Sequence, residues 1–180
     1  MADALKLKIK TLPFGIHTVG CHVDETFFNT EEQTEVRRAD VEVTLTVNRK
    51  SENAYHLEIA CRGTLTTACD RCLDDLDLPV DVDYQLNVEQ LGTEYDDSND
   101  GLLIVPEDWR ELDAAPLVRD TVLLAMPMTH SHEDPEDCNP DMLDVLDSHI
   151  VEAVPDDADN ESETTGTDPR WEALKKLKEQ

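Results

Sequence analysis

The sequence predicts a β-rich α+β fold, in which an antiparallel sheet or small open barrel carries one packed helix and a short C-terminal helix. Apolar and polar side chains alternate in several runs before residue 106, and after it the apolar spacing changes to three and four residues. The first period is typical of strands and the second of helices. Residues 155–167 almost lack apolar side chains, so the 180-residue chain suits one domain with a tail.

The first half of the chain predicts strands. In residues 5–9, leucine and isoleucine alternate with lysine, so this run should open the sheet with one face toward water. Two more alternating runs, 41–47 and 55–61, flank the turn-prone residues 48–53 and should form a hairpin.

A longer alternation follows between residues 76 and 88. It is too long to lie flat, and Pro79 should mark a bend, a bulge or an edge within it. Residues 92–100 are polar and acidic, which predicts a loop. The short apolar run 102–105 predicts another strand.

One substantial helix is expected after Pro106. Pro116 suits a first helical turn, so the regular part should begin there, and Pro127 should end the helix. The apolar residues at helical spacing are Leu112, Ala115, Leu117, Val118, Val122 and Ala125.

The C-terminal part predicts a linker and a detachable helix. Residues 155–167 are rich in acidic and small polar side chains and cannot recover their ordering entropy by burial. Asp168 is a suitable N-cap, and apolar residues line one side of the segment after it, namely Trp171, Leu174 and Leu177. The predicted organisation is a single β-rich domain over 1–154, an acidic disordered linker over 155–167 and a short helix over 168–180, which should dock on its own domain or on a partner.

The formal net charge of −27 is unevenly placed. Between Leu73 and Asp168 the sequence has 29 acidic residues and two basic ones, Arg110 and Arg119. Such a surface repels phosphate and attracts Lys- and Arg-rich partners. An acidic proteome or a solvated tail is the plain alternative. No apolar run has the length of a membrane span, so we expect a cytoplasmic protein without a membrane partner.

Three of the five cysteines belong to a candidate metal site. Their odd number, in a chain without a secretory signal, argues against a disulfide framework. The pair Cys69 and Cys72 can reach one tetrahedral zinc ion, and the segment after the helix supplies further ligands. Cys69, Cys72, His132 and Cys138 would make a Cys3His zinc site, with His130 as the alternative imidazole. Two thiols packed like small apolar residues, or a redox dithiol, are the alternatives.

Catalytic chemistry is hard to assemble from this sequence. It has none of the motifs that cradle phosphate, present a nucleophilic serine or bind a catalytic zinc ion. Its many carboxylates include pairs by chance alone, so no acid and base pair stands out. With only eight aromatic residues, it also lacks a basic, aromatic-rich face for nucleic acid. We therefore expect a binding protein and not an enzyme.

Four features in order resemble the large ribosomal RNA subunit accumulation protein family, the YceD-like proteins of bacteria and plastids. They are Arg-Gly-Thr-Leu before the Cys69 to Leu73 motif, an acidic segment, Pro116-Leu117-Val118-Arg119-Asp120 with Leu123, Leu124 and Pro127, and Asp168-Pro169-Arg170-Trp171 before Leu174 and Leu177. The resemblance runs from about Gly63 to the C-terminus. It implies a non-enzymatic protein needed for the synthesis, processing or stability of large-subunit (23S) ribosomal RNA.

The resemblance also bears on the metal and on partner binding. Many members of that family carry a second cluster of cysteines after the helix, and this chain departs from them in having only His130, His132 and Cys138 there. It is similar to a variant of the family in which a His and a Cys replace the second cysteine pair, and this similarity favours zinc. Residues expected to bind a partner are Arg119, Asp120, Asp168, Arg170, Trp171, Leu174 and Lys175.

Three functional hypotheses follow. In the first, the acidic surface binds a basic ribosomal protein or a large-subunit assembly intermediate. In the second, the C-terminal helix contacts RNA directly through Arg170, Lys175, Lys176 and Lys178, with Trp171 stacking on a base. In the third, the chain is a small zinc-binding interaction module of unrelated role.

Overall fold

The computed structural model describes residues 5–29 and 35–149. Contacts divide the chain into residues 1–148 and 149–180. The predicted linker and C-terminal helix, with Asp168, Arg170, Trp171, Leu174 and Lys175, lie outside the described residues.

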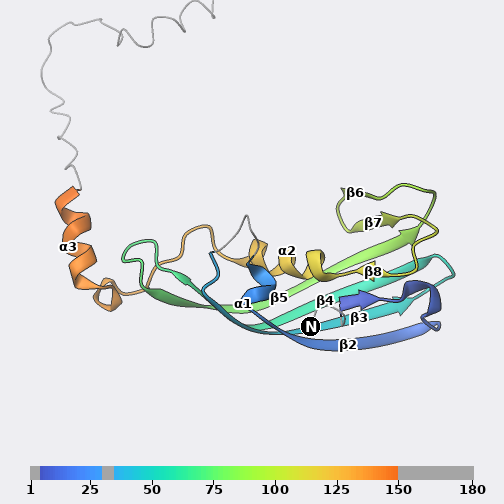
Figure 1. Cartoon of the computed structure of the whole chain (residues 1–180), viewed down its shortest axis with the longest axis horizontal. Coiled ribbons are helices and arrows are strands. Elements are labelled where there is room, and N and C mark those ends of the chain that lie inside the picture. Colours follow the sequence, from blue (N-terminus) through green and yellow to red (C-terminus); the bar gives the residue numbers. More distant parts are fainter. Residues whose placement is uncertain (1–4, 30–34, 150–180) are drawn as a thin grey trace, which may run out of the picture. The chain divides into compact units, whose positions relative to one another are not determined.

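The fold is built on an open six-stranded sheet with the order β2-β3-β4-β5-β7-β6 (Figure 1). Its strands are β2 (Gly15–Asp24), β3 (Arg38–Arg49), β4 (Ala54–Ala68), β5 (Asp75–Gln90), β6 (Asp96–Asn99) and β7 (Leu102–Val105). Neighbouring strands are antiparallel except for β5 and β7, which run parallel. The predicted β-rich α+β class is confirmed. The prediction allowed an antiparallel sheet or a small open barrel, and the structure has an open sheet in which one pair of strands, β5 and β7, is parallel.

The central hairpin follows from its alternation. β3 pairs over its full length with residues 55–66 of β4, with Val43 opposite Cys61 and Val47 opposite Leu57. All four side chains are at most 2% exposed. Because successive side chains of a strand point to opposite faces, the apolar set of each strand lies on one face and forms the main core there.

The N-terminal run was wrongly predicted to open this sheet. Only Lys6–Leu7 forms a strand, β1, which pairs with β8 (Leu112–Asp113) in a separate two-stranded sheet, and Ile9–Thr11 turns into a 3-10 helix, η2. The alternation correctly indicated that Leu5, Leu7 and Ile9 are buried, but it carries no information on which strand they pair with. Leu112, placed on the helix face by its spacing, belongs to β8.

Two strands of the sheet were missed. β2 has most of its side chains exposed or half-buried, so it lacks a clear apolar alternation. β6 lies inside the predicted acidic loop and has the sequence Asp-Asp-Ser-Asn. Its pairing with β7 rests on backbone groups, which every residue type offers.

Pro79 lies at an edge, as predicted. β4 pairs with β5 through the Thr64–Pro79 position, while β7 pairs only with the last four residues of β5. The N–H of Asn87 donates to the Gly101 carbonyl beside β7. Backbone N–H groups of successive strand residues point to opposite edges, so the N–H groups of the other odd-numbered β5 residues point to the same edge as that of Asn87. The N–H that proline lacks would therefore face an edge where the described chain places no strand, and no ladder hydrogen bond is lost.

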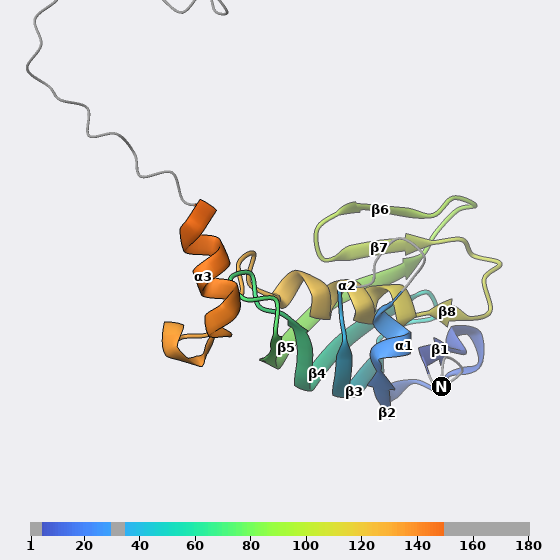
Figure 2. The same cartoon turned by 60° about the vertical axis from the view of Figure 1, so that its left-hand side comes forward.

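Helices cover one face of the sheet (Figures 1 and 2). The predicted helix is α2 (Ala115–Ala125), with Pro116 in its first turn and Val118 and Val122 fully buried. A single turn, α1 (Glu25–Phe28), is capped by the Asp24 carboxylate, which accepts from the Thr26 N–H at 3.1 Å. Besides α2, the described chain has helical segments that were not foreseen, among them α1, the 3-10 helix η3 (Pro135–Asp137) and α3 (Pro140–His149).

Replacing Tyr55 with phenylalanine should lower the free energy of unfolding by about 1–2 kcal/mol. The buried Tyr55 oxygen lies 3.1 Å from Gln90 Oε1 and 3.2 Å from the Ile9 carbonyl oxygen, so loss of its single O–H leaves a buried acceptor without a donor. Urea unfolding measures the change as a lower midpoint at unchanged slope. Tyr84→Phe, at a half-buried position of β5, is the control, and an equal loss there would contradict the role of the Tyr55 hydroxyl.

Candidate metal centre

Cys69 and Cys72 lie in a tight turn between β4 and β5. The Cys69 N–H donates to the Asp74 carbonyl at 2.8 Å, and the Leu73 N–H donates to the Cys69 carbonyl at 2.9 Å. Leu73 has a φ of 63°, the left-handed conformation that closes such a turn. Both thiols are thereby brought to one small buried cluster.

A second segment, between α2 and α3, completes the cluster. The Asp70 N–H donates to the His130 carbonyl at 2.8 Å, and the His130 N–H donates to Asp70 Oδ2 at 2.7 Å. The Arg71 guanidinium donates to the His132 carbonyl. These hydrogen bonds hold the segment against the cysteine turn and bring His132 and Cys138 to the two thiols.

The resulting geometry fits a tetrahedral zinc ion. The ligand atoms of Cys69, Cys72, His132 and Cys138 all lie within 4.8 Å of one another. His132 Nδ1 is 3.6 Å from Cys72 Sγ and 3.5 Å from Cys138 Sγ. Zinc–sulfur bonds of about 2.3 Å and zinc–nitrogen bonds of about 2.0–2.1 Å at tetrahedral angles separate sulfur and nitrogen by about 3.6 Å. The two distances from His132 Nδ1 therefore match those of a zinc site, and the remaining ligand atoms lie close enough together to be consistent with one.

The pKa values of Cys69 and Cys138 shift in opposite directions. Burial raises the pKa of Cys69, but hydrogen bonds from the backbone N–H groups of Cys72, His132 and Arg71 outweigh it and lower that pKa to about 6. Burial, followed by the neighbouring Cys72 and Cys69, raises the pKa of Cys138 to about 11. The thiolate form is thus favoured at Cys69 and opposed at Cys138. A divalent cation among them would offset both the burial and the repulsion.

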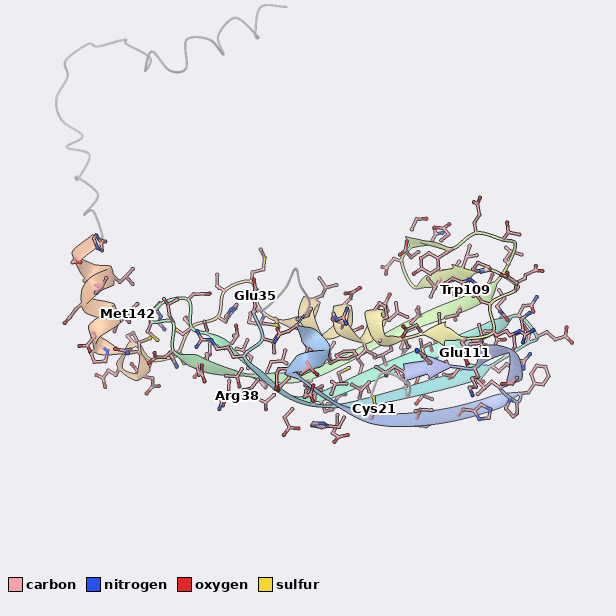
Figure 3. The ribbon with its side chains drawn as sticks, in the orientation of Figure 1. Cys21, Glu35, Arg38, Trp109, Glu111 and Met142 are labelled. Atoms are coloured by element: carbon pink, nitrogen blue, oxygen red, sulfur yellow. The ribbon has the colours of Figure 1, made fainter. Side chains whose placement is uncertain are left out.

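A small apolar shell encloses the cluster and is separate from the main core. The cysteines Cys69, Cys72 and Cys138 are 0%, 1% and 4% exposed. Leu76 of β5 packs against them together with Met142 and Leu143, which come from α3 (Figure 3). The helix that sequence reasoning missed therefore shields the sulfurs from water.

His130, the alternative ligand, and the two cysteines outside the cluster have different surroundings. His130 Nε2 lies 3.7 Å from Asp70 Oδ1, and His130 is not among the four clustered residues. Cys61 is buried in the main core, where burial raises its pKa to about 11. Cys21 is half-buried on β2. Asp70 and Arg71, which orient the second segment, were not foreseen, although they are the two residues between the paired cysteines.

Two predicted partner-binding residues lie on α2. Arg119 Nε donates to the Phe27 carbonyl at 3.1 Å, and the guanidinium carbon lies 5.4 Å from the centre of the Phe27 ring, so Arg119 ties α2 to α1. Asp120 lines a groove between α2 and the sheet. Partner binding by both residues stays a prediction.

Comparison with known proteins identifies a family. Residues 57–178 match the model of the family described as large ribosomal RNA subunit accumulation protein YceD, a span of about two thirds of the chain that includes all four clustered residues. No curated protein and no solved structure matches. None of the helices in the described ranges has the length and apolar character needed to cross a membrane.

Proposed function

We propose that this chain, which belongs to the large ribosomal RNA subunit accumulation protein YceD family, supports the accumulation of 23S ribosomal RNA as a non-enzymatic factor that binds a basic ribosomal protein or a large-subunit assembly intermediate. The family name supplies the connection to large-subunit ribosomal RNA. The binding of a basic partner is our inference from the charge of the chain.

The observation that carries this proposal is the placement of charge. Residues 73–168 hold 29 acidic and two basic side chains, and the rest of the chain holds 13 of each, so the whole net charge of −27 comes from this part. Of the two basic residues, Arg119 is engaged with Phe27. An RNA backbone would be repelled by such a surface, and a Lys- and Arg-rich protein would be attracted to it.

The described ion pairs leave this surface acidic. Arg62 pairs with Asp81 and Asp83, while Arg37 and Arg38 pair with Asp75. Figure 3 shows Arg38 on the side of the sheet away from α2. These pairs use arginines of β3, β4 and the residue preceding β3, and they offset only part of the negative charge on the wet face of β5.

We also propose that Cys69, Cys72, His132 and Cys138 hold a structural zinc ion. Four protein ligands fill a tetrahedral site and leave no position for water or substrate, which distinguishes structural from catalytic zinc. The ion would fix the segment after α2 to the turn between β4 and β5. It would thereby hold two parts of the acidic stretch 73–168 against each other.

Binding measurements with purified components test the proposed function. We expect the full chain to bind basic large-subunit ribosomal proteins at physiological salt, with an affinity that falls about tenfold or more between 50 and 200 mM salt because the attraction is screened. Naked 23S ribosomal RNA should bind far more weakly. Tight binding to the bare RNA, with no binding to any ribosomal protein, would overturn the proposal.

A shortened chain distinguishes the proposed binding of a basic protein from direct RNA contact by the C-terminal helix. A chain ending at Pro155 lacks Arg170, Trp171 and Lys175 but keeps the clustered ligands. It should bind basic ribosomal proteins within about threefold of the full chain, because it retains 23 of the 29 acidic residues of the segment. RNA binding by the full chain that disappears in the shortened one would favour the C-terminal helix as the functional element instead.

A further inference from the structure

A groove of about 490 Å³ lies between α2, β5 and the segment of β6. Its apolar lining includes Tyr84, Leu117 and Leu124, and Leu124 is 85% exposed although it belongs to the helix that packs on the sheet. Carboxylates border the same groove from β6, from the β6–β7 turn and from α2, namely Asp97, Asp100 and Asp120. The groove therefore combines an uncovered apolar floor with an acidic rim.

One wall of the groove is the free edge of a strand. β5 contributes Val82, Asp83 and Tyr84 to the lining, and in the described ranges no strand pairs with this side of β5 before Asn87. The Asn87 N–H points to this side of β5, and the backbone groups of every second residue before it point the same way. The N–H and C=O groups of Asp81, Asp83 and Gln85 therefore face the groove. Such a row of backbone groups can accept an added strand.

Carboxylates of the rim that come from different elements act on the same side chain. The pKa of the Tyr95 hydroxyl is raised by burial and then by the nearby carboxylates Asp97 and Asp120, so residues of β6 and α2 influence the same point. Trp109 stacks on Tyr95 with ring centres 5.8 Å apart, and Figure 3 shows Trp109 beside the β6–β7 hairpin. This contact holds the hairpin that carries Asp97.

We propose that this groove binds an extended, Lys- and Arg-bearing segment of a partner protein, which adds as a strand to the free edge of β5. The inference rests on the proposed function and names where the basic partner docks. Lysine and arginine fit both parts of the groove, because their aliphatic stems can cover Leu117 and Leu124 while their charged ends reach the carboxylates. The main chain of the segment would pair with Asp81, Asp83 and Gln85.

The charge contribution is tested with an eight-residue peptide of alternating lysine and valine and the full chain. The double variant D97N/D120N should bind this peptide about tenfold more weakly at physiological salt. The matched control D144N/D147N removes two exposed carboxylates from α3 and should change the affinity less than twofold. Equal losses in the two variants would show a general charge effect and would overturn the groove as the docking site.

The added strand is tested through the backbone. Saturating peptide should slow amide hydrogen exchange of Asp81, Asp83 and Gln85 by about tenfold or more, because their N–H groups become hydrogen-bonded. In an added strand, every second peptide N–H faces β5 and the others face away. Methylating the backbone nitrogens that face β5 should abolish binding, while methylating those that face away should not. Equal binding of both methylated peptides, or unchanged exchange at these three residues, would overturn strand addition.

Three further outcomes assign the groove or the function differently. Self-association of the chain that is lost in D97N/D120N would give the groove to a second copy and would contradict our inference. If D97N/D120N binds basic ribosomal proteins as well as the unmodified chain does, the groove is wrong and the proposed function stands. If the unmodified chain binds neither peptide nor ribosomal protein, the proposed function fails as well.

Discussion

Replacing Cys72 with serine is expected to abolish stoichiometric zinc binding and to loosen residues 130–149. The purified unmodified chain should contain one zinc ion per molecule by elemental analysis, held by Cys69, Cys72, His132 and Cys138. Because metal binding contributes directly to local folding, losing it should lower the free energy of opening this segment by about 3 kcal/mol or more. Hydrogen exchange in residues 130–149 should then be roughly a hundredfold faster.

The main sheet should remain folded in this variant, because the cysteine cluster and the main core are separate. Cys21→Ser is the matched control, since Cys21 is half-buried on β2 and lies outside the cluster. It should keep its zinc and its exchange rates. A purified unmodified chain that folds without metal, and whose segment is as protected with a chelator as without, would contradict the structural zinc ion.

Periodicity predicted the parts of the fold in which one face is buried. β3, β4, β5 and α2 each carry an apolar set at the spacing of their structure, because burial of one face requires it. β2 and β6 carry no such set, so their backbone pairing left no pattern in the sequence. The pairing of β1 with β8 joins residues far apart in the chain, which no local pattern encodes.

The site was predictable to the extent that residue types define it. Thiols and imidazoles are scarce in this chain, so Cys69, Cys72 and Cys138 could be grouped from the sequence. The sequence named His132 as the ligand but kept His130 as the alternative, because the positions of the two imidazoles depend on hydrogen bonds between Asp70 and the His130 backbone. The cover from α3 was also unpredictable, since only Met142 and Leu143 of that helix pack on the cluster, while its other apolar residues, Val145 and Leu146, are exposed.

Replacing Gly63 with alanine is expected to lower the free energy of unfolding by about 3–5 kcal/mol. Gly63 lies in β4 opposite Val41 of β3 and Val80 of β5 and has a φ of 155°. A Cβ there would lie 2.0 Å from the Asp40 carbonyl oxygen and 2.8 Å from Val41 Cα. Both are backbone atoms of the neighbouring strand, so no side-chain rotation relieves the clash and the two strands must separate. Urea unfolding measures the loss.

Gly20→Ala on β2 is the control, because the nearest atom to its added Cβ is the Val43 carbonyl oxygen at 3.8 Å, an ordinary contact. It should change the free energy of unfolding by less than about 1 kcal/mol and in either direction, since alanine also restricts the unfolded chain. Similar losses for the two variants would mean that strand spacing does not determine the need for glycine at position 63. A large difference would explain the glycine of the Arg-Gly-Thr-Leu sequence by the close approach of β3 and β4, independently of any partner.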